Sequence, residues 1–118
     1  MKKIYHLSTC NTCQRILKEL QPPTDTILQD IKSDPITHDQ LEALRALTDS
    51  YESLFNKRAQ LYRQRGLNQQ ELSEADYKNL ILEQYTFLKR PVMLVDQQLF
   101  VGNSKKVVAE ALLAFQKS

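Results

Sequence analysis

Apolar residues recur along the chain with two spacings, alternation over short runs and steps of three or four residues over longer stretches. Alternation in a β-rich run predicts a strand, whereas the longer step predicts an amphipathic helix. The predicted strands are residues 4–7, 26–31, 92–95 and, after a turn at 96–98, 99–101. The clearest predicted helices are residues 10–20, 37–47, 73–82 and 104–115. The chain therefore begins β-α-β-α and ends β-β-α.

Capping residues mark several of the predicted helix ends. Thr37 precedes an apolar helical pattern and Gln40 follows three residues later, which is the signature of a capping box. Leu47 is expected to lie in the helix behind this cap. Ser73 is a second candidate N-cap, and Gly66 is a candidate C-cap that ends a short helix.

Residues 49–88 differ from the rest of the chain, because they contain helical patterns and no strand signal. No cluster of Gly, Ser or Pro separates them from their neighbours, so we interpret them as a helical insertion within a single domain, residues 1–118. The complete order is β-α-β-α, helical insertion, β-β-α. This order predicts an α/β fold with a thioredoxin-like core, a small mixed sheet with helices on both faces and the insertion before the third core strand.

Two cysteines, Cys10 and Cys13, form a C-x-x-C motif between the first predicted strand and the first predicted helix. The N–H groups at the start of a helix have no partner within the helix, and the helix dipole is positive there. A thiolate at Cys10 is therefore stabilised, and its pKa is expected below the free value of about 8.5. Cys13 lies one turn later on the same helix face.

Three interpretations of this cysteine pair are open. A structural zinc site needs four ligands, and the chain adds only His6 and His38 to the cysteines. Two buried thiols without chemistry are the second interpretation, since a free cysteine packs as a small hydrophobe. A redox or nucleophilic site is the third. The position of the motif at a strand-to-helix junction, in a chain with few cysteines, favours this third interpretation.

Charge and hydropathy limit the partners and the cellular compartment that we expect for the protein. The formal net charge of +2 is too small to favour a nucleic acid or an anionic membrane as the main partner, so we expect neither. No apolar run has the length of a transmembrane helix, and the apolar stretch after Met1 is too short for a signal peptide. We therefore expect a cytoplasmic protein whose cysteines rest as thiols in a reducing environment.

Four motifs stand along the chain in a characteristic order. They are Thr9-Cys10-Asn11-Thr12-Cys13, Leu54-Phe55-Asn56-Lys57-Arg58 with residues 62–67, Leu88-Lys89-Arg90-Pro91-Val92, and Val101-Gly102-Asn103-Ser104 before the last helix. With these motifs the chain resembles the arsenate reductase (ArsC) and Spx family over essentially its whole length. The resemblance implies a thioredoxin-like core, a helical insertion and chemistry at the first cysteine.

The chain also departs from the family pattern. Asn56 and Gly102 stand near positions where the arsenate reductases of the family carry arginines, and Gln14 stands where a basic residue is expected. Those enzymes also lack a cysteine at the place of Cys13. The departures favour the CxxC-bearing branch, which is Spx-like or made of uncharacterised reductases, and they argue against a three-arginine arsenate site.

The resemblance implies specific roles. Cys10 is the expected nucleophile, and Cys13 is expected to resolve its adduct into a disulfide. The residues expected to bind a small oxyanion or a thiol substrate are Asn11, Thr12, Arg58, Arg90 and Pro91. In thioredoxin folds the proline that opens the third core strand is usually cis and faces the active cysteine, so a cis Pro91 would hold Arg90 beside Cys10. From the residues alone, a solvated helix face for Arg58 and a surface ion pair for Arg90 are the alternatives.

Two functions follow from the resemblance. The first is a thiol-dependent oxidoreductase that resembles arsenate reductase and reduces arsenate, another small oxyanion or a disulfide. It would hold no metal or bound cofactor, and glutathione, glutaredoxin or thioredoxin would donate the electrons. The second is a Spx-like redox-sensing transcriptional regulator that binds RNA polymerase, with the Cys10–Cys13 disulfide as its switch. The sequence leaves the choice between them open.

Overall fold

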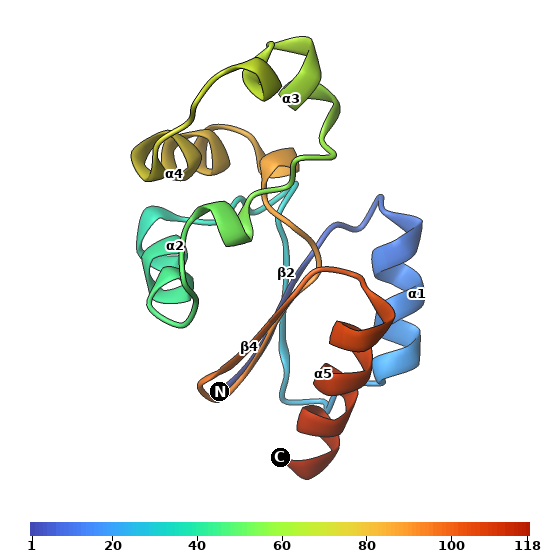
Figure 1. Cartoon of the computed structure of the whole chain (residues 1–118). Coiled ribbons are helices and arrows are strands. Elements are labelled where there is room, and N and C mark those ends of the chain that lie inside the picture. Colours follow the sequence, from blue (N-terminus) through green and yellow to red (C-terminus); the bar gives the residue numbers. More distant parts are fainter. The chain divides into compact units, whose positions relative to one another are not determined.

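The computed structural model describes residues 1–118, which form two compact units (Figure 1). The first, here called the sheet unit, comprises Met1–Asp34 and Arg90–Ser118. The second, the helical unit, is Pro35–Lys89. The predicted insertion, residues 49–88, lies within the helical unit, which begins earlier because it includes the helix after Thr37. The assignment of all 118 residues to one domain stays a prediction.

The sheet unit contains every strand of the protein and two helices. Its elements are β1 (Lys2–His6), α1 (Asn11–Leu20), β2 (Ile27–Asp30), β3 (Val92–Val95), β4 (Gln98–Val101) and α5 (Lys105–Lys117). The strand order is β2-β1-β3-β4, with β1 parallel to β2 and antiparallel to β3, and β3 antiparallel to β4. This mixed sheet confirms the predicted α/β fold of the thioredoxin type.

The two helices of the sheet unit pack together and against the sheet. Alternate residues of β1 and β3 point to one face, where Ile4 stands opposite Met93 in the antiparallel register. Both side chains are fully buried. The cluster that they form with α1 and α5 consists of Ile4, Ile16, Leu20, Met93, Val95, Val108, Ala111 and Phe115. This core fixes the direction of α1, whose first residue follows Cys10.

The β3–β4 hairpin is tighter than the sequence indicates. The predicted turn covers residues 96–98, but β4 already begins at Gln98, so the connection has two residues. Asp96 adopts a left-handed conformation with φ of 56°, which two-residue hairpin loops require. Its carboxylate accepts a hydrogen bond of 2.9 Å from the N-terminal amine of Met1.

The helical unit consists of short helices. They are α2 (His38–Arg45), α3 (Gln60–Gln64), α4 (Glu74–Glu83) and the 3₁₀ turns η1 (Glu52–Leu54), η2 (Leu67–Gln69) and η3 (Tyr85–Phe87). The predicted caps are confirmed, because Thr37 and Ser73 both form capping boxes and Gly66 follows α3 with φ of 68°. The prediction that Leu47 lies in the helix is wrong, because α2 ends at Arg45. Leu47 lies beyond α2 and is 39% exposed. Its N–H donates to the carbonyl of Leu44, three residues back, so the chain forms a tighter turn there instead of continuing the α-helix.

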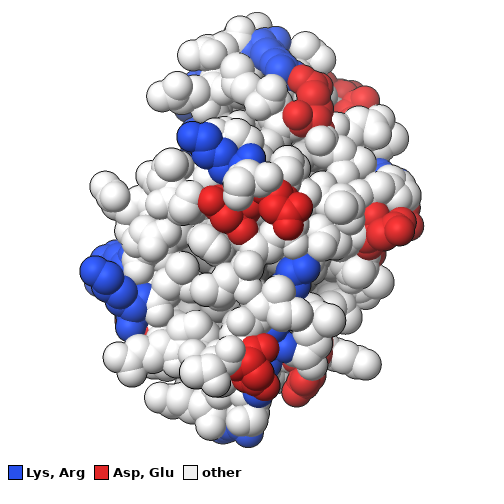
Figure 2. All heavy atoms as spheres, turned by 180° about the vertical axis from the view of Figure 1, so that it is seen from behind, with Lys and Arg blue, Asp and Glu red and all other residues white.

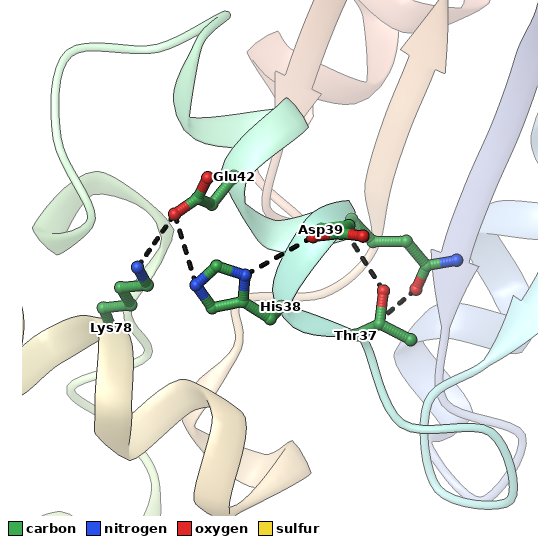
Figure 3. A network of polar contacts seen from close by, with 6 residues as sticks. Thr37, His38, Asp39, Glu42 and Lys78 are labelled. Atoms are coloured by element: carbon green, nitrogen blue, oxygen red, sulfur yellow. Dashed lines mark hydrogen bonds and ion pairs between the residues drawn. The ribbon is translucent and has the colours of Figure 1, made fainter.

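A polar network joins α2 to α4 within the helical unit (Figure 3). Glu42 accepts a hydrogen bond of 2.9 Å from Lys78 of α4 and lies 3.2 Å from Nε2 of His38. Nδ1 of His38 lies 3.5 Å from the carboxylate of Asp39. His38 is therefore an exposed residue of a surface network, as its place beside the cap at Thr37 indicates.

Charged side chains are mixed on the face shown in Figure 2, where basic and acidic groups lie in small clusters without a broad area of one sign. This distribution agrees with the formal net charge of +2. The longest helix, α5, has 13 residues, and no helix combines the length and the apolar character needed to cross a bilayer.

The core of the sheet unit yields a test of its packing. Phe115 is 3% exposed, whereas Leu113 on the same helix is 55% exposed. Phe115→Ala should lower the free energy of unfolding by about 3–5 kcal/mol, because it leaves a cavity between α5 and the sheet. Leu113→Ala is the matched control and should change it by less than about 0.5 kcal/mol. Urea titration followed by circular dichroism measures both, and equal effects would contradict this core.

Candidate active site

Cys10 occupies the boundary between the loop after β1 and the first turn of α1. It is the N-cap residue of α1, in extended conformation with φ of −96° and ψ of 115°, and its own N–H donates to the carbonyl of Leu7 at 3.0 Å. The backbone N–H groups of Thr12 and Cys13 lie close enough to the Cys10 sulfur to lower its pKa. The predicted location of Cys10 at a strand-to-helix junction is confirmed.

The pKa of the Cys10 thiol is lowered. Partial burial raises this pKa, but that effect is outweighed by the N–H and thiol of Cys13, by the N–H of Thr12 and by the positive charge of Arg90. All of these groups favour the thiolate, because each presents a hydrogen-bond donor or a cation to the sulfur. A larger share of Cys10 is therefore ionised near neutral pH than of a free cysteine.

Cys13 has the opposite property. The pKa of its thiol is raised to about 11, mainly by burial and also by the negative charge of the neighbouring Cys10, against the lowering effects of the Leu7 backbone and Arg90. The side chain is fully buried, and both cysteines are free thiols. At neutral pH Cys13 therefore keeps its proton, and its thiol favours a negative charge on the Cys10 sulfur.

Arg90 and Pro91 open β3 in the same unit as Cys10. The Arg90–Pro91 peptide bond is cis, as expected from the position of this proline. The carbonyl of Pro91 accepts a hydrogen bond of 2.9 Å from Gly102, which ties the start of β3 to the end of β4. The charge of Arg90 lowers the pKa of both Cys10 and Cys13, so its guanidinium acts on both sulfurs.

Asn11 and Thr12 begin α1 beside Cys10. Asn11 is exposed and Thr12 is half-buried. The N–H groups of a first helical turn have no partner within the helix and are suited to an anion. The backbone of Thr12 already donates to Cys10, whereas a role for either side chain stays a prediction.

Arg58 belongs to the helical unit, so its predicted convergence on Cys10 stays a prediction. The segment that carries it is held by Asn56, whose side chain accepts from the Arg58 N–H at 3.0 Å and donates to the Thr86 carbonyl at 3.2 Å. The N–H of Asn56 also donates to Phe87 at 2.7 Å. Phe55 stacks on Phe87 with ring centroids 5.1 Å apart. The Arg58 side chain is exposed, and these contacts hold the backbone segment that carries it.

The histidine and carboxylate side chains do not form a metal-binding site beside the cysteines. His6 ends β1 with a buried Nδ1 that has no hydrogen-bond partner, and His38 lies in the surface network of α2. No group of three or more His, Cys, Asp or Glu is arranged to hold a metal ion.

Comparison with known proteins identifies the family. The model of the ArsC family matches residues 5–111. The chain belongs to the ArsC family. The resemblance inferred from the four motifs is therefore confirmed.

Curated relatives and solved structures agree with the assignment to the ArsC family. Global transcriptional regulator Spx 2 of Bacillus cereus is 26% identical over 111 residues, covering 92% of this chain and 85% of its own length. Global transcriptional regulator Spx of Enterococcus faecalis is 26% identical over 104 residues, covering 86% and 79%. The structure of an arsenate reductase from Vibrio cholerae aligns with a TM-score of 0.77 at 17% identity, covering 93% of this chain and 96% of that one. This last likeness shows the shared fold alone.

Two side chains near Cys10 in this ArsC-family protein were not singled out from the sequence. Ser8 and Asp30 are joined by hydrogen bonds between the loop before Cys10 and the end of β2. The available signal was topological, because the carboxyl ends of parallel neighbouring strands lie at the same edge of a sheet. Only the register that pairs His6 with Asp30 shows which residue meets the loop.

The electrostatics of Cys10 can be tested with Arg90→Ala. Loss of this cation disfavours the thiolate, so the Cys10 pKa should rise and the alkylation rate at pH 7 should fall. The rate of iodoacetamide modification at Cys10, followed by mass spectrometry against pH, gives the pKa directly. Arg15→Ala is the matched control, since Arg15 is an exposed residue of α1 and does not contribute to the Cys10 pKa. Faster labelling of Cys13 than of Cys10 in the unmodified protein would contradict the assignment.

Proposed function

We propose that this ArsC-family chain is a thiol-dependent oxidoreductase that reduces a small oxyanion, with arsenate as the first candidate, or a disulfide. One observation carries the proposal, the contrast between the lowered pKa of Cys10 and the pKa of about 11 for Cys13. A nucleophile must be ionised before attack, whereas a resolving thiol must stay unreactive until an adduct has formed. The two cysteines meet these opposite requirements.

The chemistry with arsenate proceeds in two steps. The Cys10 thiolate bonds to arsenic, and an arsenate oxygen leaves as water after taking up protons from solvent. A second thiolate then attacks the Cys10 sulfur, the sulfur–arsenic bond breaks, and its electron pair leaves with arsenite. Two thiols have lost two electrons and As(V) has become As(III). With a disulfide as substrate, the same two attacks release two thiolates.

Cys13 is the second thiol in this proposal. Its proton must leave before it attacks, and an adduct on Cys10 assists this loss. The negative charge on the Cys10 sulfur raises the pKa of Cys13 in the free protein, and the sulfur loses this charge when it bonds to the substrate. The Cys10–Cys13 disulfide that results is returned to thiols by glutathione, glutaredoxin or thioredoxin, and no bound cofactor is needed.

The substrate site in this proposal is built around Cys10. Arg90 neutralises the charge of the oxyanion, the N–H of Asn11 and the hydroxyl of Thr12 donate hydrogen bonds to it, and Pro91 faces the thiol. Arg58 supplies a second guanidinium, whose planar fork of donors suits an oxyanion or the carboxylate of glutathione. Because Asn56 and Gly102 add no charge, the affinity for arsenate should be lower than that of a three-arginine site.

A redox-sensing regulator is the second candidate function. The curated relatives described as Spx are global transcriptional regulators, and alignments with them cover most of this chain. In this alternative the same thiolate contrast serves a switch, because an ionised Cys10 is oxidised first and Cys13 then closes the disulfide. RNA polymerase would be the partner.

Arsenate turnover and polymerase capture separate the two functions. For the enzyme, purified protein with glutathione and glutaredoxin, or with thioredoxin, should produce arsenite over many turnovers. Cys10→Ser should abolish this activity, and Cys13→Ser should lower it unless glutathione replaces the resolving thiol. The regulator is favoured if the protein captures purified RNA polymerase in a manner that depends on the Cys10–Cys13 redox state. The enzyme is contradicted if the same protein turns over neither arsenate nor a disulfide.

The role of Arg58 can be tested by anion protection. Arsenate or sulfate bound over Cys10 should slow its alkylation, and the concentration giving half-protection reports affinity. Arg58→Ala should raise this concentration about tenfold, the effect expected on removing a charge-assisted hydrogen bond. Arg63→Ala is the matched control, because Arg63 is an exposed arginine in the nearby helix α3. An Arg58→Ala variant that equals this control would remove Arg58 from the site.

A further inference from the structure

The loop between β1 and α1, residues 7–10, determines where the Cys10 sulfur lies. The lowered pKa of Cys10 depends on N–H groups of α1, so the sulfur must be held in front of the helix while the loop itself belongs to no regular element. In Figure 1 the loop precedes α1 at the same end of the sheet where β2 finishes. Asp30 is the last residue of β2 and pairs in register with His6, directly before the loop.

Asp30 holds the loop through Ser8. One carboxylate oxygen of Asp30 accepts from the Ser8 hydroxyl at 2.6 Å, and the other accepts from the Ser8 N–H at 3.3 Å. The second oxygen also accepts from the N–H of Lys32 at 3.2 Å, so the chain directly after β2 helps to orient the carboxylate. The 2.6 Å contact has the length of a charge-assisted hydrogen bond.

The same loop residue is also held by α1. The side-chain amide of Gln14 donates to the carbonyl of Ser8 at 3.2 Å. Ser8 therefore bonds to β2 through its N–H and hydroxyl and to α1 through its carbonyl. These contacts fix the backbone two residues before Cys10 on both sides, and Cys10 itself bonds back to Leu7.

We propose that Asp30, acting through Ser8, is a positioning residue for the Cys10 thiolate. It holds the loop so that the Cys10 sulfur meets the N–H groups of Thr12 and Cys13, without contacting the substrate itself. This inference rests on the proposed role of Cys10 as the nucleophile. It adds to the site a carboxylate and a hydroxyl that the four family motifs do not contain.

The sign of the effect distinguishes positioning from simple charge. A carboxylate near a thiol disfavours the thiolate, so removing its charge alone should lower the pKa of Cys10. Losing the hold on the loop should instead raise that pKa, because the sulfur moves away from its donors. Asp30→Ala removes both the charge and the acceptors, and its net effect under this proposal is a rise.

The experiment measures the iodoacetamide reaction of Cys10 against pH by mass spectrometry of the Cys10 peptide. In Asp30→Ala the midpoint should rise toward the free value of about 8.5. At a pH well below the midpoint, a rise of one unit in the Cys10 pKa lowers the thiolate fraction, and with it the reaction rate, about tenfold. Asp30→Asn removes the charge but keeps an acceptor for the Ser8 N–H, so its midpoint should equal that of the unmodified protein or lie slightly below it. Ser8→Ala should fall between them. The rate plateau at high pH should be common to all.

Asp25→Ala is the matched control. Asp25 precedes β2 at its other end, where its carboxylate lies 3.4 Å from Lys2, so its loss removes the same charge without touching the loop. Its midpoint should equal that of the unmodified protein. A shift as large as that of Asp30→Ala would overturn the proposal.

Other outcomes also decide. A midpoint for Asp30→Ala at or below that of the unmodified protein overturns positioning, and so does an Asp30→Asn midpoint that rises as far as that of Asp30→Ala. If Asp30→Ala does not fold, Ser8→Ala decides, since an unchanged midpoint there overturns the role of the loop. An ordinary Cys10 pKa in the unmodified protein would overturn the proposed nucleophile itself, whereas a low one unaffected by these variants overturns this inference alone.

Discussion

The contact between the first turn of α1 and the Cys10 sulfur is the interaction on which the site depends. Backbone N–H groups supply it, so it requires no special side chain but does require an accurately placed helix. The placement comes from the buried face of α1, where Ile16 and Leu20 pack against the sheet and α5. The hydrophobic core and the reactive thiol are therefore two consequences of one helix position.

Burial gives the two cysteines different thiol pKa values. They lie three residues apart on one helix, yet burial raises the pKa of Cys13 to about 11, while donors and Arg90 outweigh burial at Cys10. The difference keeps a proton on Cys13, whose thiol favours a negative charge on the Cys10 sulfur. An attacking thiol and a waiting thiol can thus be built from the same residue type, and either reductase chemistry or redox sensing can use them.

The helical unit shows how a departure from a family pattern can keep a structural purpose. Asn56 lacks the charge of an arginine, but its amide binds the Arg58 N–H and the Thr86 carbonyl at once. The residue thereby orders the backbone that carries Arg58.

The sequence by itself determined the order of elements, the caps at Thr37 and Ser73 and the location of Cys10, because these depend on neighbours within a few residues. It also placed Leu47 in a helix that ends earlier, since helix ends follow competing local turns. Only the tertiary structure decided that Asp30 meets Ser8 and that Cys13 is buried enough to stay protonated. Strand register and the desolvation of a thiol arise from residues distant in sequence, so no local pattern could predict them.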